Sequence, residues 1–241
     1  MRFGKIGCAP MMKKWTARDY VQDGLVAMWD GIENAGWGVH DPNAVVWKDL
    51  SGNGYDATLG RFCSFGDNYC ATDGGISAVG YATSRTEKWA DDIVHMEAVG
   101  SSQDVTKTVC FVGCNVIHAD NVSSNIKGIG IGTTDGIWTG KVNNGKTGFG
   151  GYTLVNDKIY SISTEWASSG AVCINGEILT KNNTTAAYLN AGGSLTIFNS
   201  GYTAYSTPPM KVFSVRLYSR ALTAAEIATN YEIDKIRFNL P

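Results

Sequence analysis

The chain has 241 residues, of which 44% are hydrophobic and 17% are charged, and its formal net charge is −2. This length and hydrophobic content allow a sizeable core, in one large domain or two small ones, and the small net charge gives no support to nucleic-acid binding. No stretch approaches the roughly 20 apolar residues that a membrane-spanning helix needs. The 29 glycines against 5 prolines favour many tight turns, as in a sheet protein.

Residues 1–20 are predicted to form a basic N-terminal arm. Residues 1–18 contain no acid and five basic residues, which are Arg2, Lys5, Lys13, Lys14 and Arg18. The rest of the chain then carries 15 basic and 22 acidic residues, a net charge of −7. Such an arm suits docking on a partner or an anionic surface, with a solvated terminus as the alternative.

Lysines 13 and 14 interrupt the leader before an apolar region can form, so no signal peptide is expected. The sequence therefore predicts synthesis in the cytoplasm. Trimming from a longer precursor and export by another route, such as release of a virus particle, are the alternatives.

From Gly24 onward, short strand-like runs alternate with glycine-rich turns. Trp29 and Trp47 lie within such runs, at 25–30 and 44–50, and are expected in the core. Residues 107–117 are apolar on both faces, as a central sandwich strand would be. Asn175-Gly176 tolerates the positive φ angles of a type I′ turn, so 170–181 is predicted to be a hairpin. The pattern indicates an all-β fold, a two-sheet antiparallel jelly-roll sandwich in one domain over residues 21–241.

Six cysteines do not force a disulfide framework in a chain of this length. Cys110 and Cys114 lie in one apolar run and read as small core residues, too far apart along a strand to be bridged. Cys63 and Cys70 flank the possible turn "FGDN" and could form a disulfide in an oxidising compartment.

One short helix is predicted close to the C-terminus, within residues 210–238. In "LTAAEI", Thr223 and Glu226 form a capping box, and Leu222 and Ile227 occupy the positions of a hydrophobic staple. Ile227 and Tyr231 share a helix face that could pack on the sheet. The helix therefore reads as a structural clasp.

Three segments resemble concanavalin A-like, laminin-G-type jelly-roll domains. "VFSVRLYSRALTAAEI" is similar to the closing strand and helix of that family, "WKDLSGNGYDATL" to a family strand and turn, and "VCINGEIL" to a family hairpin. The resemblance covers about residues 24–238, and "DGLVAMWDGIENAGWG" resembles versions carried by gut bacteria and their prophages. It implies a sandwich of two curved sheets that serves sugar binding, protein binding, glycan hydrolysis or purely structural roles. Fold alone does not decide among these.

Two acidic groupings are candidates for the catalytic carboxylates of a glycoside hydrolase. "EIDKIR" (232–237) superficially fits the Glu-x-Asp-x-x-Glu strand motif of the laminarinase-type branch, but Arg237 replaces the final acid and the segment continues a capped helix. "ADDIVHMEAV" could align Asp91, His95 and Glu97 on one strand face, or Asp91 and His95 on one helix face, although an exposed loop or edge strand explains it as well. Hence no catalytic residue and no enzymatic activity are expected.

Aromatic residues in loops beside polar groups are the candidates for sugar binding, because sugars present apolar C–H faces and a rim of hydroxyls. The candidate ligand-binding residues are Trp37, Asp135, Trp138, Asn143, Tyr152, Tyr202 and Tyr205. Calcium is a candidate metal, with oxygen ligands from Asp49, Asn53 and Asp56, which serve equally well as turn-organising Asx residues.

The leading hypothesis is a non-catalytic, lectin-like module that binds a glycan or host cell surface. The expected setting is a phage virion, as a tail or capsid-surface component that becomes extracellular after release. Residues 1–20 would contact other virion proteins or sister copies in a homo-oligomer. A purely structural decoration protein is the first alternative, and a glycoside hydrolase is the second.

Overall fold

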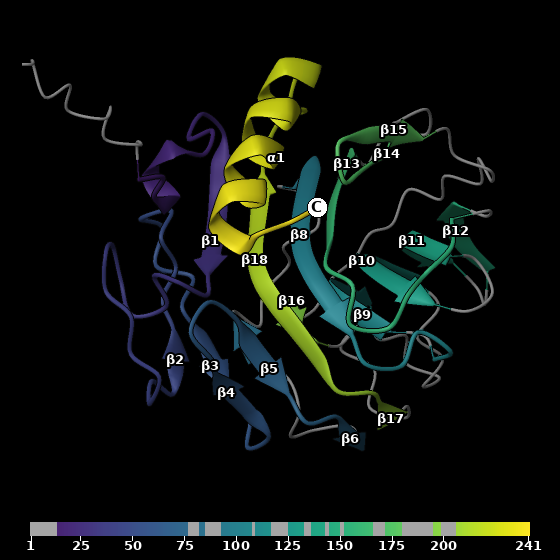
Figure 1. Ribbon diagram of the computed structural model, residues 1–241, viewed down its shortest axis with the longest axis horizontal. Helices are drawn as coiled ribbons and strands as arrows, with labels where there is room; N and C mark the ends of the chain where they lie inside the picture. Colours follow the sequence, from purple (N-terminus) through teal and green to yellow (C-terminus); the bar gives the residue numbers. More distant parts are fainter. Residues whose placement is uncertain are drawn as a thin grey trace, which may run out of the picture.

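The computed structural model describes residues 14–76, 82–84, 93–107, 109–116, 125–132, 136–142, 145–149, 152–165, 172–179, 195–198 and 206–241. Figure 1 shows two facing β-sheets with a helix across the outer side of one of them. The sheet beneath the helix is called the helix-side sheet, and the other is called the opposite sheet. The predicted all-β fold with a helix near the C-terminus is confirmed.

The helix-side sheet has strand order β15-β14-β13-β8-β18-β5-β4, with β1 also paired to β18. Its strands are β1 Leu25–Asp30, β4 Cys63–Phe65, β5 Cys70–Thr72, β8 His95–Ser102, β13 Tyr160–Glu165, β14 Val172–Ile174, β15 Glu177–Leu179 and β18 Met210–Tyr218. β8 lies between β13 and β18 in antiparallel register, so it forms the centre of the surface on which the helix rests.

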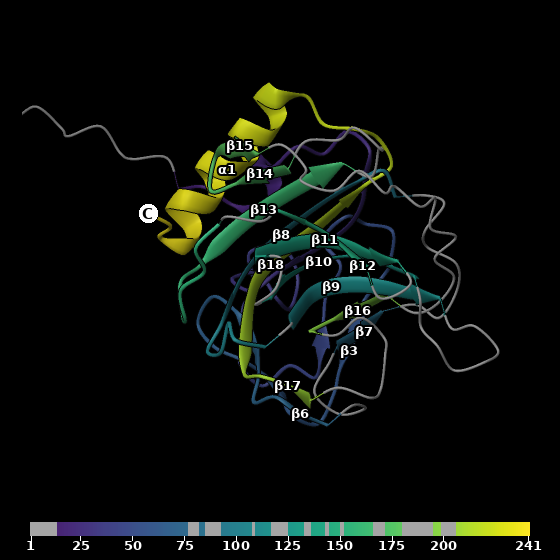
Figure 2. The same cartoon turned by 90° about the vertical axis from the view of Figure 1, so that its right-hand side faces the viewer.

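The opposite sheet has strand order β12-β11-β10-β9-β16-β7-β3-β2. Its strands are β2 Val46–Trp47, β3 Ala57–Leu59, β7 Ala82–Ser84, β9 Val109–Val116, β10 Asn125–Gly132, β11 Gly136–Val142, β12 Gly145–Phe149 and β16 Leu195–Ile197. A separate small pair joins β6 Gly75–Ile76 to β17 Ser206–Thr207. Figure 2 shows the two sheets in layers, with the helix outside the first layer.

The main core fills the space between the sheets. Trp29 and Trp47 are fully buried there, as predicted, and their indole N–H groups donate to backbone carbonyls at 3.1 and 3.0 Å. Alternate residues of β8 point in opposite directions, because successive side chains of a strand lie on opposite faces. Met96 and Ala98 enter this core, whereas Val99 joins a second cluster beneath the helix.

The outward-facing positions of the helix-side sheet are largely polar and buried. They include His95, Glu97, Ser161, Ser163, Ser214, Arg216 and Asp30. Polar side chains on a sheet face that is exposed to water can hydrogen-bond to water, but this face is covered by a helix. The polar groups must therefore find partners within the protein.

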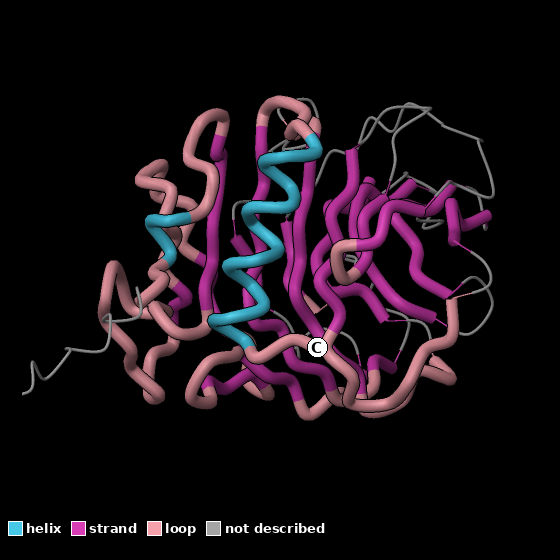
Figure 3. Tube along the Cα trace, turned by 45° about the horizontal axis from the view of Figure 1, so that its top comes forward, coloured by secondary structure: helices cyan, strands magenta, loops and turns pink. Residues whose placement is uncertain are grey.

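The helix α1 spans Ala224–Phe238 and lies along the outer face of the central strands (Figure 3). The predicted capping box is confirmed: Thr223 Oγ1 accepts from the Glu226 N–H, and the Glu226 carboxylate accepts from the Thr223 N–H at 2.8 Å. The helix ends at Phe238, and its C-cap Asn239 has a left-handed φ of 53°. Within the described residues, no helix is long and apolar enough to cross a membrane.

The buried face of α1 is polar as well as apolar. Its buried residues are Asn230, Ile233, Asp234 and Phe238. The predicted packing residues Ile227 and Tyr231 are half-buried and lie along one edge of the helix. Tyr231 still packs against the buried cluster that contains Val99 and Phe213, so the buried face is rotated from the predicted one but keeps part of it.

The described part of the predicted arm, residues 14–20, packs against the body. It contains the 3₁₀ turn η1, Ala17–Asp19, and buries Ala17 and Tyr20 with Ile233 and Met28. The Tyr20 hydroxyl donates to Asp234 at 2.8 Å. Residues 1–13 lie outside the described residues, and the domain boundary at residue 20 stays a prediction.

The two predicted hairpins lie in the helix-side sheet. Asn175 and Gly176 join β14 to β15 with φ angles of 48° and 81°, both positive as a type I′ turn requires. Cys63 and Cys70 flank the β4–β5 turn as free thiols, and burial raises the pKa of Cys63 to about 11. Cys110 is buried as predicted, while the side chain of Cys114 lies outside the described residues.

Candidate functional site

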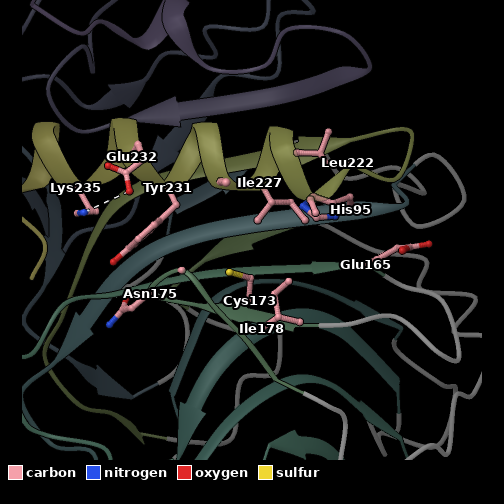
Figure 4. A pocket seen from close by; sticks show the side chains of 13 residues that line it. His95, Glu165, Cys173, Asn175, Ile178, Leu222, Ile227, Tyr231, Glu232 and Lys235 are labelled. Atoms are coloured by element: carbon pink, nitrogen blue, oxygen red, sulfur yellow. Dashed lines mark hydrogen bonds and ion pairs between the residues drawn. The ribbon is translucent and has the colours of Figure 1, made fainter.

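A groove of about 580 Å³ runs between α1 and the β14–β15 hairpin (Figure 4). One wall comes from the helix and the residue before its cap, and the other comes from the hairpin. The wall residues are Leu222, Ala224, Ile227, Ala228, Tyr231, Glu232 and Lys235 on one side, and Cys173, Asn175, Gly176 and Ile178 on the other. His95 and Glu165, from β8 and β13, complete the lining.

Apolar side chains make up much of the two walls. Leu222 is buried, Ile227 is half-buried, and Ile178 stands 64% exposed on the hairpin. Ile227 and Ile178 lie on opposite sides of the groove in Figure 4. A ligand with an apolar face could therefore be covered from both sides, as small-molecule sites commonly require.

Tyr231 and Lys235 form the end of the groove toward the helix C-terminus. The Lys235 ammonium lies 5.7 Å from the centre of the Tyr231 ring and 3.3 Å from the Glu232 carboxylate. The Tyr231 ring crosses the hairpin turn so closely that a Cβ added to Gly176 would lie 2.6 Å from it. Glycine at the turn thus lets an aromatic ring and polar groups lie together beside the apolar walls.

His95 contributes a ring nitrogen beneath the N-terminal half of α1. The residue is 1% exposed, and its Nε2 lies 2.9 Å from Ser163 Oγ and 3.7 Å from Glu97 Oε1. Its Nδ1 is buried and has no hydrogen-bond partner within the described residues. Because a buried polar atom without a partner costs about 1–3 kcal/mol, this nitrogen favours a ligand group that can bond to it.

A fully buried ionic cluster underlies the groove and α1. Arg216 donates through Nε to Glu97 at 2.7 Å, and through both terminal nitrogens to Asp234 at 2.9 and 2.7 Å. Asn230 donates to the same Glu97 oxygen at 2.8 Å. Burial acts to raise the pKa of Glu97, but the Arg216 guanidinium and the neighbouring His95 ring lower this pKa to about 2. The cluster fixes the helix to the sheet and so sets the width of the groove.

A second ionic cluster ties the helix C-terminus to the start of the chain. Arg237 donates to Asp30 at 2.7 Å, to Glu33 at 3.1 Å and to the Trp15 carbonyl at 3.0 Å. "EIDKIR" is thus helical, as predicted. The prediction of a charged helix face missed that Asp234 and Arg237 point into the protein, because a sequence without contacts does not reveal their partners.

The acidic groups that are candidates for glycan hydrolysis do not form a catalytic pair among the described residues. Glu97 is 2% exposed and bonded to Arg216, and Asp234 is fully buried. Asp91 lies outside the described residues. Retaining hydrolysis needs two carboxyls that reach the substrate, which these buried groups do not.

Two candidate sugar-binding residues have described side chains, and both are half-buried. Trp37 lies against the N-terminal segment, with the Arg18 guanidinium 4.9 Å from its ring centre. Tyr152 packs edge-on against Tyr160 at 6.0 Å, next to Asn175 of the groove wall, and burial raises its pKa. Neither residue lines the groove.

The other five candidates cannot be placed at the site. Trp138 belongs to β11, and its side chain lies outside the described residues. Four lie outside the described residues, and these are Asp135, Asn143, Tyr202 and Tyr205. The sugar-binding roles of all seven stay predictions. The sequence relates His95 only to the neighbouring acids Asp91 and Glu97, and no pattern in it indicates an unpartnered ring nitrogen.

The candidate calcium ligands bond to the protein itself. Asp49 accepts from the N–H groups of Met28, Ser51 and Tyr55 at 2.9–3.0 Å and from the Ser51 hydroxyl at 2.7 Å. Asp56 accepts from Lys48 at 2.6 Å, and Asn53 donates to the Val26 carbonyl at 2.8 Å. These bonds are those of turn-organising residues. Since the oxygens already have donors, they do not fit a cation well, and the calcium assignment stays a prediction.

A second, smaller hollow of about 260 Å³ lies at the β4–β5 edge, between that hairpin and the start of β18. Tyr69 and Lys211 line it, with the ammonium 4.6 Å from the ring centre. No buried polar atom without a partner is found there among the described residues. The groove beside α1 is therefore the stronger candidate.

Comparison with known proteins places the fold but not a family. No family's sequence profile and no curated protein matches the sequence. Solved structures, however, match the fold of this chain. Trypanosoma rangeli sialidase in complex with sialic acid matches with a TM-score of 0.63 and 17% identity over 89% of this chain. The botulinum neurotoxin type G receptor-binding domain gives 0.56 and 14% over 88%. The binding domain of botulinum neurotoxin DC, in complex with SialylT, gives 0.57 and 12% over 88%.

At these identities the likeness shows a shared β-sandwich fold. The chain spans 33% of the sialidase chain and 51% of each toxin chain. The expectation that this chain is not an enzyme is corrected by the sialidase matches, because those solved chains are enzymes that contain this fold. A β-sandwich of this kind is therefore no argument against an enzyme.

Proposed function

We propose that this chain is a lectin-like module that binds a glycan in the groove beside α1. The observation that carries the proposal is the buried, unpartnered Nδ1 of His95 between two apolar walls. Sugars combine apolar C–H faces with hydroxyls that both donate and accept hydrogen bonds, so they suit walls of Ile227 and Ile178 beside a bare ring nitrogen. The groove volume of about 580 Å³ is in the range of small-molecule sites.

The solved structures of similar fold support this proposal indirectly. One sialidase structure holds sialic acid, and one toxin binding domain holds SialylT. A shared fold does not imply a shared ligand, so the proposal of glycan binding rests on the residues of the groove. Because the chain spans a third of the sialidase and half of the toxin chains, such a module could also serve a larger glycan-active protein.

A groove-blocking substitution tests the proposal. Ala228→Arg places a long side chain in the groove from an exposed helix position, and arginine is a good helix former. Ala225→Arg is the matched control, since Ala225 is exposed on the same helix and does not line the groove. On an array of neutral and sialylated glycans, Ala228→Arg should lose binding, whereas Ala225→Arg should keep it. Equal binding by both variants would place any glycan site elsewhere.

The finer identity rests on the sequence. We propose a laminin-G-type domain of the concanavalin A-like superfamily, supported by the closing strand and helix, the Asn175-Gly176 hairpin and the "DLSGNGYD" turn. The resemblance of the opening segment to prophage proteins supports a role as a virion component that contacts a host cell surface. A virion protein of this kind would form a homo-oligomer and be extracellular after release.

A further inference from the structure

The groove beside α1 is elongated rather than round. Six of its lining residues are spaced three or four positions apart on the helix and so form one stripe along it, namely Ala224, Ile227, Ala228, Tyr231, Glu232 and Lys235. From its first residue to its last, the stripe advances by eleven residues, which is about 16 Å at a rise of about 1.5 Å per residue. The groove volume of about 580 Å³ is therefore drawn out along the helix axis.

The hairpin wall follows the helix over much of this length (Figure 4). Toward the C-terminal end of the helix, the Tyr231 ring lies against Gly176 of the hairpin turn. Further along, Ile178 stands 64% exposed and lies across the groove from Ile227. Glu165, the last residue of β13, lies beyond them, toward the N-terminal end of the helix. A ligand can thus contact side chains on both sides of the groove along its length, and not at one point only.

The chemistry of the lining changes along the groove. In the half nearer the helix N-terminus, the apolar side chains of Ile227 and Ile178 lie on opposite walls. At the other end, the Lys235 ammonium lies 5.7 Å from the centre of the Tyr231 ring and 3.3 Å from the Glu232 carboxylate. An ammonium only donates and a carboxylate only accepts, so this end can bond to hydroxyls in both senses. Ile227 and Lys235 are eight residues apart, or about 12 Å along the helix, which is more than a single sugar ring spans.

On the basis of the proposed function, we infer that the groove takes a linear oligosaccharide that lies along α1 with about three sugar units in contact, rather than a single terminal sugar. A pyranose unit lengthens a chain by about 5 Å, so about three units fit into a length of about 16 Å. One unit then covers the apolar pair Ile227 and Ile178, while another bonds to Lys235 and Glu232. A branch on the central unit would meet one of the two walls, so the groove favours unbranched chains.

The first test is the dependence of binding on chain length. An array would carry cello-, laminari-, chito- and manno-oligosaccharides of increasing length from the monosaccharide upward, together with branched N-glycans. In a series that binds, each added unit up to the third should tighten binding about tenfold, the effect of one or two further hydrogen bonds, and longer chains should bind little better. Equal binding of a monosaccharide and its trisaccharide, or binding of branched glycans alone, would overturn the inference and leave the proposed function intact. Binding of no glycan would overturn both.

The second test maps the bound chain on the unchanged protein. The mono- and trisaccharide of the series that binds on the array are titrated separately, and the backbone amide signals of α1 are followed by NMR. The trisaccharide should shift the signals of both ends of the stripe, Ala224 and Lys235, whereas the monosaccharide should shift one end only. Shifts confined to one end at saturating trisaccharide would mean that the chain does not lie along the helix, and would overturn the inference.

The third test shortens the groove from one end. Ala224→Gln places a longer, uncharged side chain at the N-terminal end of the stripe, and Ala225→Gln is the matched control, because Ala225 is exposed and outside the described lining. Ala224→Gln should weaken trisaccharide binding about tenfold, to the level of the disaccharide, and leave the disaccharide unchanged. Ala228→Arg, which blocks the groove between its ends, should abolish binding of both sugars. An equal effect of Ala224→Gln on the two sugars, or no effect on either, would overturn the inference.

Discussion

Arg216 is the residue on which the buried contacts beneath α1 converge. Its guanidinium bonds to Glu97, Asp234 and the Ser214 hydroxyl, and its centre lies 4.0 Å from the middle of the Tyr20 ring. Buried ion pairs contribute little net stability by themselves, but removing one partner leaves an uncompensated charge in the interior. Replacement of a single residue of this cluster is therefore expected to destabilise the fold, because it would leave a buried charge unpaired.

Glu97→Gln should destabilise the fold in a pH-dependent way. The pKa of Glu97 is lowered from its ordinary value of 4.5 to about 2, mainly by Arg216 acting against desolvation. A lowered pKa in the folded state means that the ionised form stabilises above about pH 4.5 and that this stabilisation is lost as the pH falls toward 2. The shift corresponds to about 3 kcal/mol. Urea unfolding of the unchanged protein and of Glu97→Gln should therefore show a difference in unfolding free energy that becomes smaller as the pH falls toward 2.

Glu232→Gln is the control for this experiment. Glu232 is exposed on the same helix and pairs with Lys235 at 3.3 Å. Exposed pairs contribute little, so its variant should unfold close to the unchanged protein across the same pH range. A Glu97→Gln gap that stays constant down to about pH 2 would contradict the role assigned to the carboxylate.

What the sequence predicts at the scale of residues depends on hydrophobicity. Trp29 and Trp47 were predicted in the core because burial of a large apolar side chain needs no particular partner. Asp234 and Arg237 were read as surface charges, because charged side chains are rarely buried without partners. Those partners, Arg216, Asp30 and Glu33, lie far along the chain, and a single sequence does not reveal such pairs.

At the scale of elements, α1 was predictable because its signals are local. The capping box of Thr223 and Glu226 involves residues three apart, and the structure confirms it. The face that the helix buries was not predictable. Apolar spacing favours Ile227 and Tyr231, and Tyr231 does pack against a buried cluster. The fully buried face, however, also carries the polar residues Asn230 and Asp234, which face the polar outer side of the sheet. The groove exists because the predicted apolar face is left at the edge of the helix.

Thr223→Ala should destabilise the protein by about 1 kcal/mol, because it removes the side-chain acceptor of the helix N-cap. Thr223→Ser keeps the hydroxyl and should restore most of the loss. Thermal or urea unfolding measures both variants. An alanine variant as stable as the serine variant would show that the cap contributes little here.

Gly176→Ala should destabilise the β14–β15 hairpin beyond the strain of its backbone. Its φ is +81°, and an added Cβ would lie 2.6 Å from the Tyr231 ring. Gly54→Ala is the matched control, with φ +80° and no atom within 4 Å of an added Cβ. Both should lose about 1 kcal/mol from left-handed strain, with a further loss for Gly176→Ala alone. Equal unfolding free energies would mean that the ring moves aside freely.

At the scale of the molecule, the N-terminal segment belongs to the body from residue 14 onward. A chain that starts at residue 14 should unfold like the full chain, since it keeps every described contact. A chain that starts at residue 21 loses Ala17 and Tyr20, and with Tyr20 the hydroxyl bonded to Asp234. Loss of a buried aromatic ring should cost at least about 3 kcal/mol. Thermal unfolding of the three chains measures this.

Comparison of the full chain with the chain that starts at residue 14 separates an effect on assembly from an effect on folding. If residues 1–13 mediate the proposed homo-oligomer, the chain from residue 14 should become monomeric by light scattering while staying folded. Removal of residues 1–20 would confuse the two effects, because it also empties a buried site. An unchanged mass for the chain from residue 14 would exclude the first thirteen residues as the assembly element.

The pairing of β1 with β18 has a mechanical consequence. Leu25 lies opposite Tyr218, so the first residue of β1 and the last residue of β18 lie next to each other. Tension applied between the two chain ends would therefore peel the strands apart one hydrogen bond at a time, the weakest geometry for a ladder under load. Arg237 follows β18 and donates to the carbonyl of Trp15, which precedes β1, so this bond joins the two chain ends ahead of the strand pair. This contact would therefore bear the tension before the hydrogen bonds between β1 and β18 do.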